Sequence, residues 1–279
     1  MTHLSLGFSP CPNDTYIFYA VDNKKVDIGD FIVQTYVEDV ETLNHRALEI
    51  NKKPSLDITK VSFYTYGFLR QSYTLLNSGA ALGRGCGPLI VSKKARSIED
   101  LKGATLAAPG RFTTAYLLFK LYEASISPLD LKIKFIPFNE IMPLVSNDKA
   151  DAGIIIHESR FTYQNYGLTE LIDLGRWWED KTGLPIPLGG IIAKQSLGDK
   201  VIKTFDDILY RSINYAKNNY DEALPYIRQY CCELSDDVIK AHINLYVNNY
   251  TFDLDKRGKK AIDTLYNMAD EYKLFDKIR

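Results

Sequence analysis

The chain has few of the residues from which metal centres are built. Its 279 residues include four cysteines and four histidines. No Cys-x-x-Cys pair and no His-Glu-x-x-His spacing occurs, so the sequence predicts no metal site. The cysteines are Cys11, Cys86, Cys231 and Cys232, and we interpret the last two, which lie in a helical pattern, as small core residues.

An excess of one charge sign and long apolar runs are absent as well. Lys and Arg number 34 and Asp and Glu number 35, which gives a formal net charge of −1. This balance predicts neither a nucleic-acid partner nor attachment to an anionic membrane surface. No apolar run is long enough to cross a membrane, and the N-terminal residues lack the basic start and apolar core of a signal peptide. The sequence therefore predicts a cytoplasmic protein without disulfide bonds, as a monomer or a small homo-oligomer.

Strand-like and helix-like segments alternate along the first two thirds of the chain. This alternation predicts an α/β fold with mostly parallel strands. The apolar patterns predict strands at residues 4–8, 31–37, 56–61, 104–108, 132–138 and 152–156. They predict helices at residues 40–50 and 139–147, and others that begin near residues 16 and 114.

The C-terminal region is almost wholly helical, with periodic apolar positions at residues 200–219, 221–231, 235–248 and 255–272. Two extended apolar stretches, residues 88–92 and 187–193, bracket the middle third of the chain and indicate strands that cross between lobes. We predict a discontinuous lobe of residues 1–91 and 189–279, and a second lobe of residues 92–188. A cleft between two such lobes is a common ligand site.

The segment Asp-Ala-Gly-Ile-Ile-Ile-His-Glu-Ser-Arg, residues 151–160, is the most informative stretch. Its three isoleucines are too short a run and too β-branched for a helix, and they indicate a strand buried on both faces. In open α/β sheets, ligands bind just beyond the carboxyl ends of strands, which is where His157 follows. An imidazole there is suited to proton transfer near neutral pH. The alternative is that His157 only closes the strand by hydrogen bonding to the backbone.

Two further segments supply donors suited to an anionic ligand. The turn at residues 109–115 lies between a strand and a helix, so backbone N–H groups and the positive end of the helix dipole meet near Thr113 and Thr114. Lys60 and Ser62 point to the same side of an extended chain, and an ammonium beside a hydroxyl suits a carboxylate. In both segments the plainer alternative is a helix cap, with a solvated lysine in the second.

Other candidates have weaker support. The glycine-rich residues 83–88 precede a strand, whereas a dinucleotide fingerprint must open a helix, so we interpret them as a tight turn and leave Arg84 open as an anion ligand. Cys11 stands where a thiol pKa can be lowered, but no histidine nearby in the sequence could serve as its base. His242 falls on an apolar stripe, which favours a structural histidine.

Several of these segments together resemble the 1,4-dihydroxy-6-naphthoate synthase family of the futalosine route to menaquinone. The resemblance covers residues 4–192 and continues at residues 233–237. The motifs that carry it are Gly7-Phe-Ser-Pro-Cys-Pro-Asn-Asp-Thr15, Glu38-Asp-Val-Glu-Thr-Leu-Asn44, Gly83-Arg-Gly85, Pro109-Gly-Arg111 with Thr113-Thr-Ala-Tyr116, Ile155-Ile-His-Glu-Ser-Arg-Phe-Thr-Tyr163, and Trp177-Trp-Glu179 with Thr182-Gly-Leu-Pro185.

The resemblance implies a two-lobed fold like that of type II periplasmic binding proteins, used as an enzyme. It implies conversion of cyclic dehypoxanthine futalosine, a small-molecule carboxylate, to 1,4-dihydroxy-6-naphthoate with release of dihydroxyacetone. It implies no metal and no organic cofactor. His157 takes the family's proton-acceptor role, and the substrate-contact stretches fall on Lys60-Val61-Ser62 and on Thr114-Ala115. Phe112 stands where some relatives carry a second histidine.

These expectations lead to one mechanistic hypothesis and to rivals. Neutral His157 would remove a proton from the bound substrate, and a carbon–carbon bond would then break as the aromatic naphthalene system forms. The closest rival is the chorismate dehydratase of the same pathway, against which the segment from His157 to Tyr163 argues. A non-catalytic cytosolic solute-binding protein would share the fold, and fold alone does not settle function. A ligand-sensing module would bring a DNA-binding or membrane segment, and neither is visible.

Overall fold

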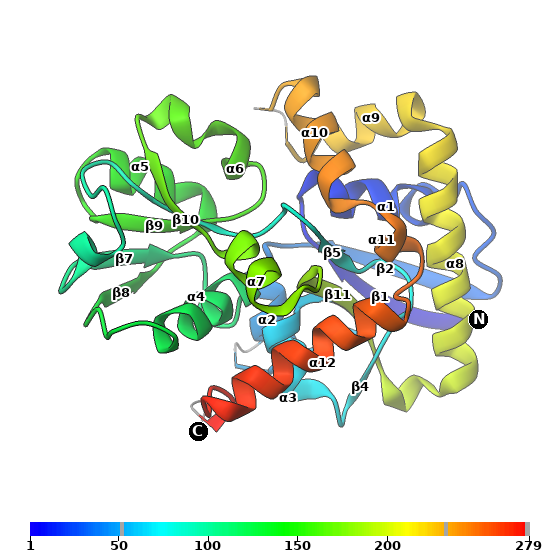
Figure 1. Ribbon diagram of the computed structural model, residues 1–279. Coiled ribbons are helices and arrows are strands. Elements are labelled where there is room, and N and C mark those ends of the chain that lie inside the picture. The colour runs from blue at the N-terminus through cyan, green and yellow to red at the C-terminus, as the bar shows by residue number, and fades with distance from the viewer. Residues whose placement is uncertain (51–52, 232–233, 277–279) are drawn as a thin grey trace. The chain divides into compact units, whose positions relative to one another are not determined.

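The computed structural model describes residues 1–50, 53–231 and 234–276 (Figure 1) and contains two compact units. Unit 1 comprises Met1–Gly83 and Leu188–Lys259, and unit 2 comprises Arg84–Pro187 and Lys260–Arg279. This division differs from the expected lobe boundaries mainly at residues 84–91 and 260–279, which lie in unit 2. The cleft expected between the lobes stays a prediction, and Cys232 lies outside the described residues.

Unit 1 is built on a mixed sheet. Strand β1 (Thr2–Phe8) pairs in parallel with β2 (Phe31–Val37) and β3 (Ile58–Ser62). Strand β11 (Ile186–Lys194) then runs antiparallel to β3 and to β4 (Tyr73–Leu75), and β5 (Ala81–Gly83) also pairs with β11. The prediction of mostly parallel strands is therefore right for β1, β2 and β3 and wrong for the strands paired through β11.

Helices of unit 1 pack on this sheet and on one another. The buried helix α1 contacts three helices of the C-terminal region, and the apolar residues Phe205, Leu209 and Ile213 of the longest of them share one core with Ile17 of α1. The helices are α1 (Pro12–Asp22), α2 (Val40–Ala47), α3 (Phe63–Leu69), α8 (Asp199–Asn218), α9 (Tyr220–Arg228), α10 (Asp236–Tyr246) and α11 (Asn249–Phe252).

Unit 2 has its own mixed sheet, with the strand order β10-β6-β9-β7-β8. Strand β7 (Thr105–Ala108) pairs in parallel with β8 (Lys132–Phe135) and β9 (Ala152–Ile155), whereas β6 (Leu89–Ser92) runs antiparallel to β9 and to β10 (Thr169–Asp173). Every residue of β9 is buried, as the run of isoleucines predicts.

The helices of unit 2 include the second part of the C-terminal helix α12 (Lys256–Glu271). Ala261, Leu265 and Ala269 of this helix are fully buried. Thr182 at the end of α7 and Thr264 of α12 line the same surface pocket. The remaining helices are α4 (Thr114–Ala124), α5 (Phe138–Ser146), α6 (Ser159–Thr162) and α7 (Leu174–Thr182), with short 3₁₀ turns at Glu99–Leu101, Tyr163–Tyr166 and, in unit 1, Gln195–Leu197.

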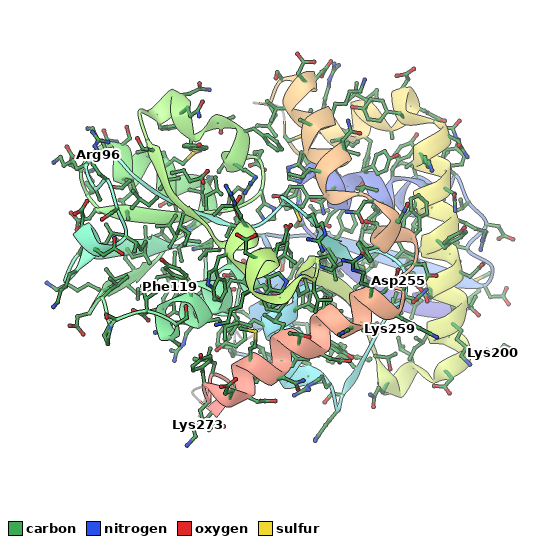
Figure 2. The ribbon with its side chains drawn as sticks, in the orientation of Figure 1. Arg96, Phe119, Lys200, Asp255, Lys259 and Lys273 are labelled. Atoms are coloured by element: carbon green, nitrogen blue, oxygen red, sulfur yellow. The ribbon has the colours of Figure 1, made fainter. Side chains whose placement is uncertain are left out.

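The side chains follow the burial expected of an α/β protein (Figure 2). Phe119 of α4 is fully buried, whereas Arg96 and Lys200 are exposed at the surface of their units. Over the described residues, no helix combines the length and the apolar character that crossing a membrane requires.

Candidate functional site

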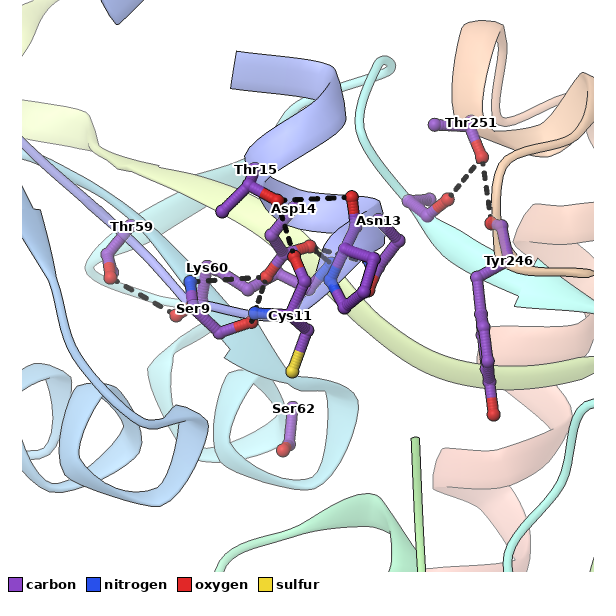
Figure 3. A network of polar contacts seen from close by, with 12 residues as sticks. Ser9, Cys11, Asn13, Asp14, Thr15, Thr59, Lys60, Ser62, Tyr246 and Thr251 are labelled. Atoms are coloured by element: carbon purple, nitrogen blue, oxygen red, sulfur yellow. Dashed lines mark hydrogen bonds and ion pairs between the residues drawn. The ribbon is translucent and has the colours of Figure 1, made fainter. Parts of the chain in front are cut away.

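In unit 1 the candidate residues gather at one edge of the sheet. Strands β1 and β3 are parallel neighbours, with Leu6 opposite Ile58 and Gly7 opposite Thr59, so their carboxyl ends meet. The turn that follows β1 opens helix α1, and Lys60 lies close to the carboxyl end of β3. The fold therefore brings together two segments that the sequence analysis singled out, the turn after β1 and the end of β3 (Figure 3).

Asp14 is the centre of the polar network at this edge. Its Oδ2 accepts hydrogen bonds from the Ser9 hydroxyl at 2.7 Å and the Ser9 N–H at 3.3 Å. Its Oδ1 accepts from Asn13 Nδ2 at 2.8 Å and from Lys60 Nζ at 2.9 Å. Asp14 and Lys60 are only 1% and 5% exposed, so this is a buried ion pair whose carboxylate is fully hydrogen-bonded.

The same network extends to the C-terminal region of the chain. Asn13 Oδ1 lies 2.9 Å from His242 Nε2, and both residues are buried. The His242 ring also packs against the ring of Tyr246. These contacts agree with the structural role predicted for His242, and they tie helix α10 to the start of α1.

Lys60 is held at the sheet edge by its neighbours. A Cβ atom on Gly189 of the adjacent strand would lie 2.7 Å from the Val61 carbonyl oxygen and 3.3 Å from Lys60 Cε, so only glycine allows this close approach. The Val61 side chain packs in an apolar cluster with Ala47 and Tyr73. A ligand contact at Val61 would therefore involve its main chain.

Ser62 is positioned by helix α2. Asn44, fully buried, donates from Nδ2 to Ser62 Oγ at 3.1 Å, and its Oδ1 accepts the Ser62 N–H at 2.9 Å. Asn44 Nδ2 also donates to Glu41 Oε2 at 2.9 Å. A hydrogen bond to Glu41 raises the pKa of His45, which lies on the same helix. Ser62 stands at the N-cap position of α3, yet its side chain makes no capping hydrogen bond.

In unit 2 a second set of candidates gathers at the carboxyl ends of β7 and β9, which are parallel neighbours. Thr113 is the N-cap of α4: its hydroxyl accepts the Tyr116 N–H at 3.2 Å and donates to the Gly110 carbonyl at 2.9 Å. Thr114 and Ala115 form the first turn of this helix and are buried. Thr113 is therefore the cap, and it presents the backbone N–H groups of Thr114 and Ala115 at the positive end of the helix.

His157 follows β9 after one residue, at the same sheet edge. Its φ of 56° lies in the left-handed region, which is uncommon for residues other than glycine, although histidine, asparagine and aspartate adopt it more often than most. The ring of Phe138, which opens α5, meets the imidazole edge-on at 5.2 Å between centroids. The strained backbone turns the chain out of the strand immediately at the residue that the sequence singled out.

Arg160 fixes the segment that follows His157. It donates from Nη1 to the Gly87 carbonyl at 2.7 Å and from Nη2 to Asp173 Oδ2 at 2.6 Å. Its own N–H donates to the His157 carbonyl at 3.3 Å. The other oxygen of Asp173 caps α7 through the Gly175 N–H at 2.8 Å. The guanidinium is thus part of the support of the His157 turn.

The other candidates have structural partners. Arg84 donates to Glu179 Oε2 at 3.1 Å and to the Gly183 carbonyl at 2.6 Å, as suits a residue of the predicted tight turn. Burial raises the pKa of the Cys86 thiol to about 12, which makes it a poor nucleophile. Cys11 is the buried N-cap residue of α1.

Among the residues that the structure describes, no three His, Cys, Asp or Glu side chains are grouped so as to hold a metal ion. Sequence reasoning missed the supporting residues Asn44 and Asp14. The sequence did mark both residues: Asn44 ends one of the family motifs, and Asp14 is an acidic residue in the first turn of a helix that follows a strand. Neither feature identifies the distant residue with which the side chain pairs.

Comparison with known proteins identifies the family. A family model described as menaquinone biosynthesis matches residues 4–271. The chain belongs to this family. It is 45% identical over 270 residues, which cover 97% of this chain and 95% of the relative, to the 1,4-dihydroxy-6-naphtoate synthase of Thermus thermophilus. The synthase of the same name from Streptomyces coelicolor is 42% identical over 95% of this chain and 92% of its own. The chain is therefore an enzyme of menaquinone biosynthesis.

Solved structures confirm the expected fold. Protein AF1704 from Archaeoglobus fulgidus is 34% identical, with a TM-score of 0.89 over 98% of both chains. The periplasmic aliphatic sulphonate binding protein SsuA from Escherichia coli has a TM-score of 0.67 at 12% identity, over 98% of this chain and 88% of SsuA. At that identity the second likeness shows the fold alone, that of periplasmic binding proteins.

Proposed function

We propose that this member of the menaquinone biosynthesis family is a carbon–carbon lyase that converts cyclic dehypoxanthine futalosine to 1,4-dihydroxy-6-naphthoate and releases dihydroxyacetone. The observation that carries the proposal is the 45% identity, over nearly the whole chain, with a protein named 1,4-dihydroxy-6-naphtoate synthase. Two relatives of that name, and the segment from His157 to Tyr163, support this reaction over that of a chorismate dehydratase or of a binding protein.

His157 is the general base in this proposal. Its support is its place just beyond a buried strand, on a backbone that a residue other than glycine seldom adopts. A neutral imidazole accepts a proton from the substrate, and the electron pair left behind forms a new double bond as the neighbouring carbon–carbon bond breaks. The electron pair of the broken bond passes into the ring system that becomes the aromatic naphthalene, and the other fragment leaves as dihydroxyacetone. The proton then resides on His157 until it is returned to product or solvent.

We further propose that the substrate is held by two sets of donors. Lys60, Val61 and Ser62 supply an ammonium, a main-chain group and a hydroxyl, and Thr114 and Ala115 supply N–H groups at a helix start. Because an ammonium has three N–H donors and Asp14 accepts one of them, Lys60 retains donors for a carboxylate. The cytoplasmic location, the lack of a cofactor and the oligomeric state expected from the sequence remain predictions.

The decisive experiment incubates the purified protein with cyclic dehypoxanthine futalosine and follows 1,4-dihydroxy-6-naphthoate by chromatography and mass. General base catalysis contributes about 10²–10⁴-fold, so His157→Asn should lose activity to that extent while still binding the substrate. Asparagine tolerates the left-handed backbone, which keeps the fold intact in this variant.

The matched control is His3→Asn, since His3 is exposed and belongs to no candidate site. This variant should keep the wild-type rate. Turnover of chorismate by the wild-type protein, with none of the futalosine compound, would establish the rival enzyme instead. Full activity of His157→Asn would exclude His157 as the base.

A further inference from the structure

The hydroxyl of Ser62 has an unusual set of partners for a serine at a helix start. A serine at the N-cap normally accepts a hydrogen bond from the first turn of its own helix. Here the side chain makes no such bond, and Oγ instead accepts from Asn44 Nδ2 at 3.1 Å. The partner of this hydroxyl is therefore a residue of helix α2 and not a backbone N–H of α3.

The orientation of the Asn44 amide is fixed by groups that cannot exchange roles. Its Oδ1 accepts the backbone N–H of Ser62 at 2.9 Å, and a backbone N–H can only donate. Its Nδ2 must then face both Ser62 Oγ and Glu41 Oε2, and the Glu41 carboxylate can only accept. Full burial of Asn44 excludes solvent as an alternative partner.

This arrangement dictates what the hydroxyl can do. Because its oxygen already accepts from Asn44, the single hydrogen of Ser62 is directed away from α2. We propose that Asn44 is a positioning residue that makes Ser62 an obligatory hydrogen-bond donor to the substrate. The recognised group is then an acceptor, and with the Lys60 ammonium on the same side of β3 it is a carboxylate. The inference rests on the proposed function, because it deepens the role of the same residues.

The test reverses the direction of the hydrogen-bond chain. In Asn44→Asp, both side-chain oxygens at position 44 accept, so Ser62 donates to this new carboxylate rather than to substrate. The neighbouring carboxylate of Glu41 would repel this group, so the Glu41→Gln/Asn44→Asp double variant is the second form of the test. There the amide introduced at position 41 donates to position 44. The hydrogen bonds from position 44 to position 41 and to Ser62 Oγ are both kept with their direction reversed, while the Ser62 N–H still donates to position 44.

Both variants, and Ser62→Ala, should each lose roughly 10- to 100-fold in kcat/KM toward cyclic dehypoxanthine futalosine, because each removes one hydrogen bond to a charged group. The loss should fall mainly on KM, since the contact is made in the ground state as well as in the transition state. In a Ser62→Ala background the position-44 changes should add no more than about twofold, because both act through one hydroxyl.

The matched control is Asn214→Asp, which changes a partly exposed amide that donates to the Tyr210 carbonyl, and it should leave the kinetics unchanged. A merely structural role for Asn44 would give losses that multiply with those of Ser62→Ala, and that result would overturn the inference. Wild-type kinetics in the double variant would also overturn it, while the proposed function stands. A wild-type protein that neither binds nor converts the compound, measured by calorimetry and turnover, would overturn the proposed function and the inference with it.

Discussion

At the scale of single residues, the candidate catalytic residue His157 is one of several residues other than glycine with a positive φ. The left-handed conformation of His157 costs a residue other than glycine roughly 1–2 kcal/mol. Glycine relieves this strain, although it is also more flexible in the unfolded chain. If the strain is retained for function, a substitution at position 157 that relieves it should favour stability and reduce activity.

We therefore expect His157→Gly to be more stable than His157→Ala by about 1 kcal/mol, because alanine keeps the Cβ atom that makes the conformation unfavourable. Both variants should lose at least about 10²-fold in activity, since neither can accept the proton. Urea denaturation and steady-state kinetics measure the two effects. Equal stability of the two variants would show that the backbone at this position is not strained.

At the scale of elements, unit 2 joins the turn after β9 to the start of α7 through one guanidinium. Arg160 spans the Gly87 carbonyl and Asp173, and Asp173 is also the N-cap of α7. Gly87 and Gly175 make this close packing possible, because a Cβ atom on Gly87 would lie 2.3 Å from Gly175 Cα. The position of the His157 turn therefore depends on a contact between segments that are far apart in sequence.

Replacing Arg160 by methionine should lower the free energy of unfolding by about 1.5–3 kcal/mol, the usual contribution of a hydrogen bond to a charged group. Arg160→Lys should recover only part of this loss, because a lysine cannot present the two fixed N–H directions that the site uses. The control Arg176→Met removes an exposed arginine 3.9 Å from Asp180, and it should change stability by no more than about 0.5 kcal/mol. Chemical denaturation of the three variants tests this, and similar losses in all three would contradict the assigned role.

At the scale of the whole molecule, the chain is shared between two units that are discontinuous in sequence. Each unit has a mixed sheet and its own apolar core, one around Phe18 and Phe205 and one around Val91 and Ile141. Helix α12 begins in unit 1, and its residues from Lys260 onward belong to unit 2. A substitution in that part of the helix should therefore weaken unit 2.

We expect Leu265→Ala, which truncates a fully buried side chain, to cost about 2–5 kcal/mol and to increase amide hydrogen exchange mainly in β6–β10. Leu209→Ala in α8 is the matched change in unit 1, and it should increase exchange mainly in β1–β3. Hydrogen exchange followed by mass spectrometry separates the two patterns. Faster exchange in β1–β3 for Leu265→Ala would instead support the lobe boundary expected from the sequence.

The sequence by itself determined the local features of this protein. The β-branched isoleucines predicted the strand before His157, and the spacing of apolar residues predicted the helices of the C-terminal region. The predicted ends of these elements differ from the observed ends by a few residues. These signals are local, because a strand or helix imposes its period on neighbouring residues. The short segments β4, β5, β10, α3, α6 and α11 were missed, since three to seven residues are too few to show a clear hydrophobic periodicity. The nine-residue helix α7 was missed as well. The sequence also named His157, Lys60, Ser62 and the start of α4 as candidates.

Only the tertiary structure decided the partners of those candidates. Asn44 lies 18 residues from Ser62, Asp14 lies 46 from Lys60, and His242 lies 229 from Asn13, yet each pair is within hydrogen-bond distance. A buried polar group must find a partner, but its own sequence neighbourhood does not say which one. That choice follows from how the sheet and helices pack, and packing likewise assigned the end of α12 to unit 2.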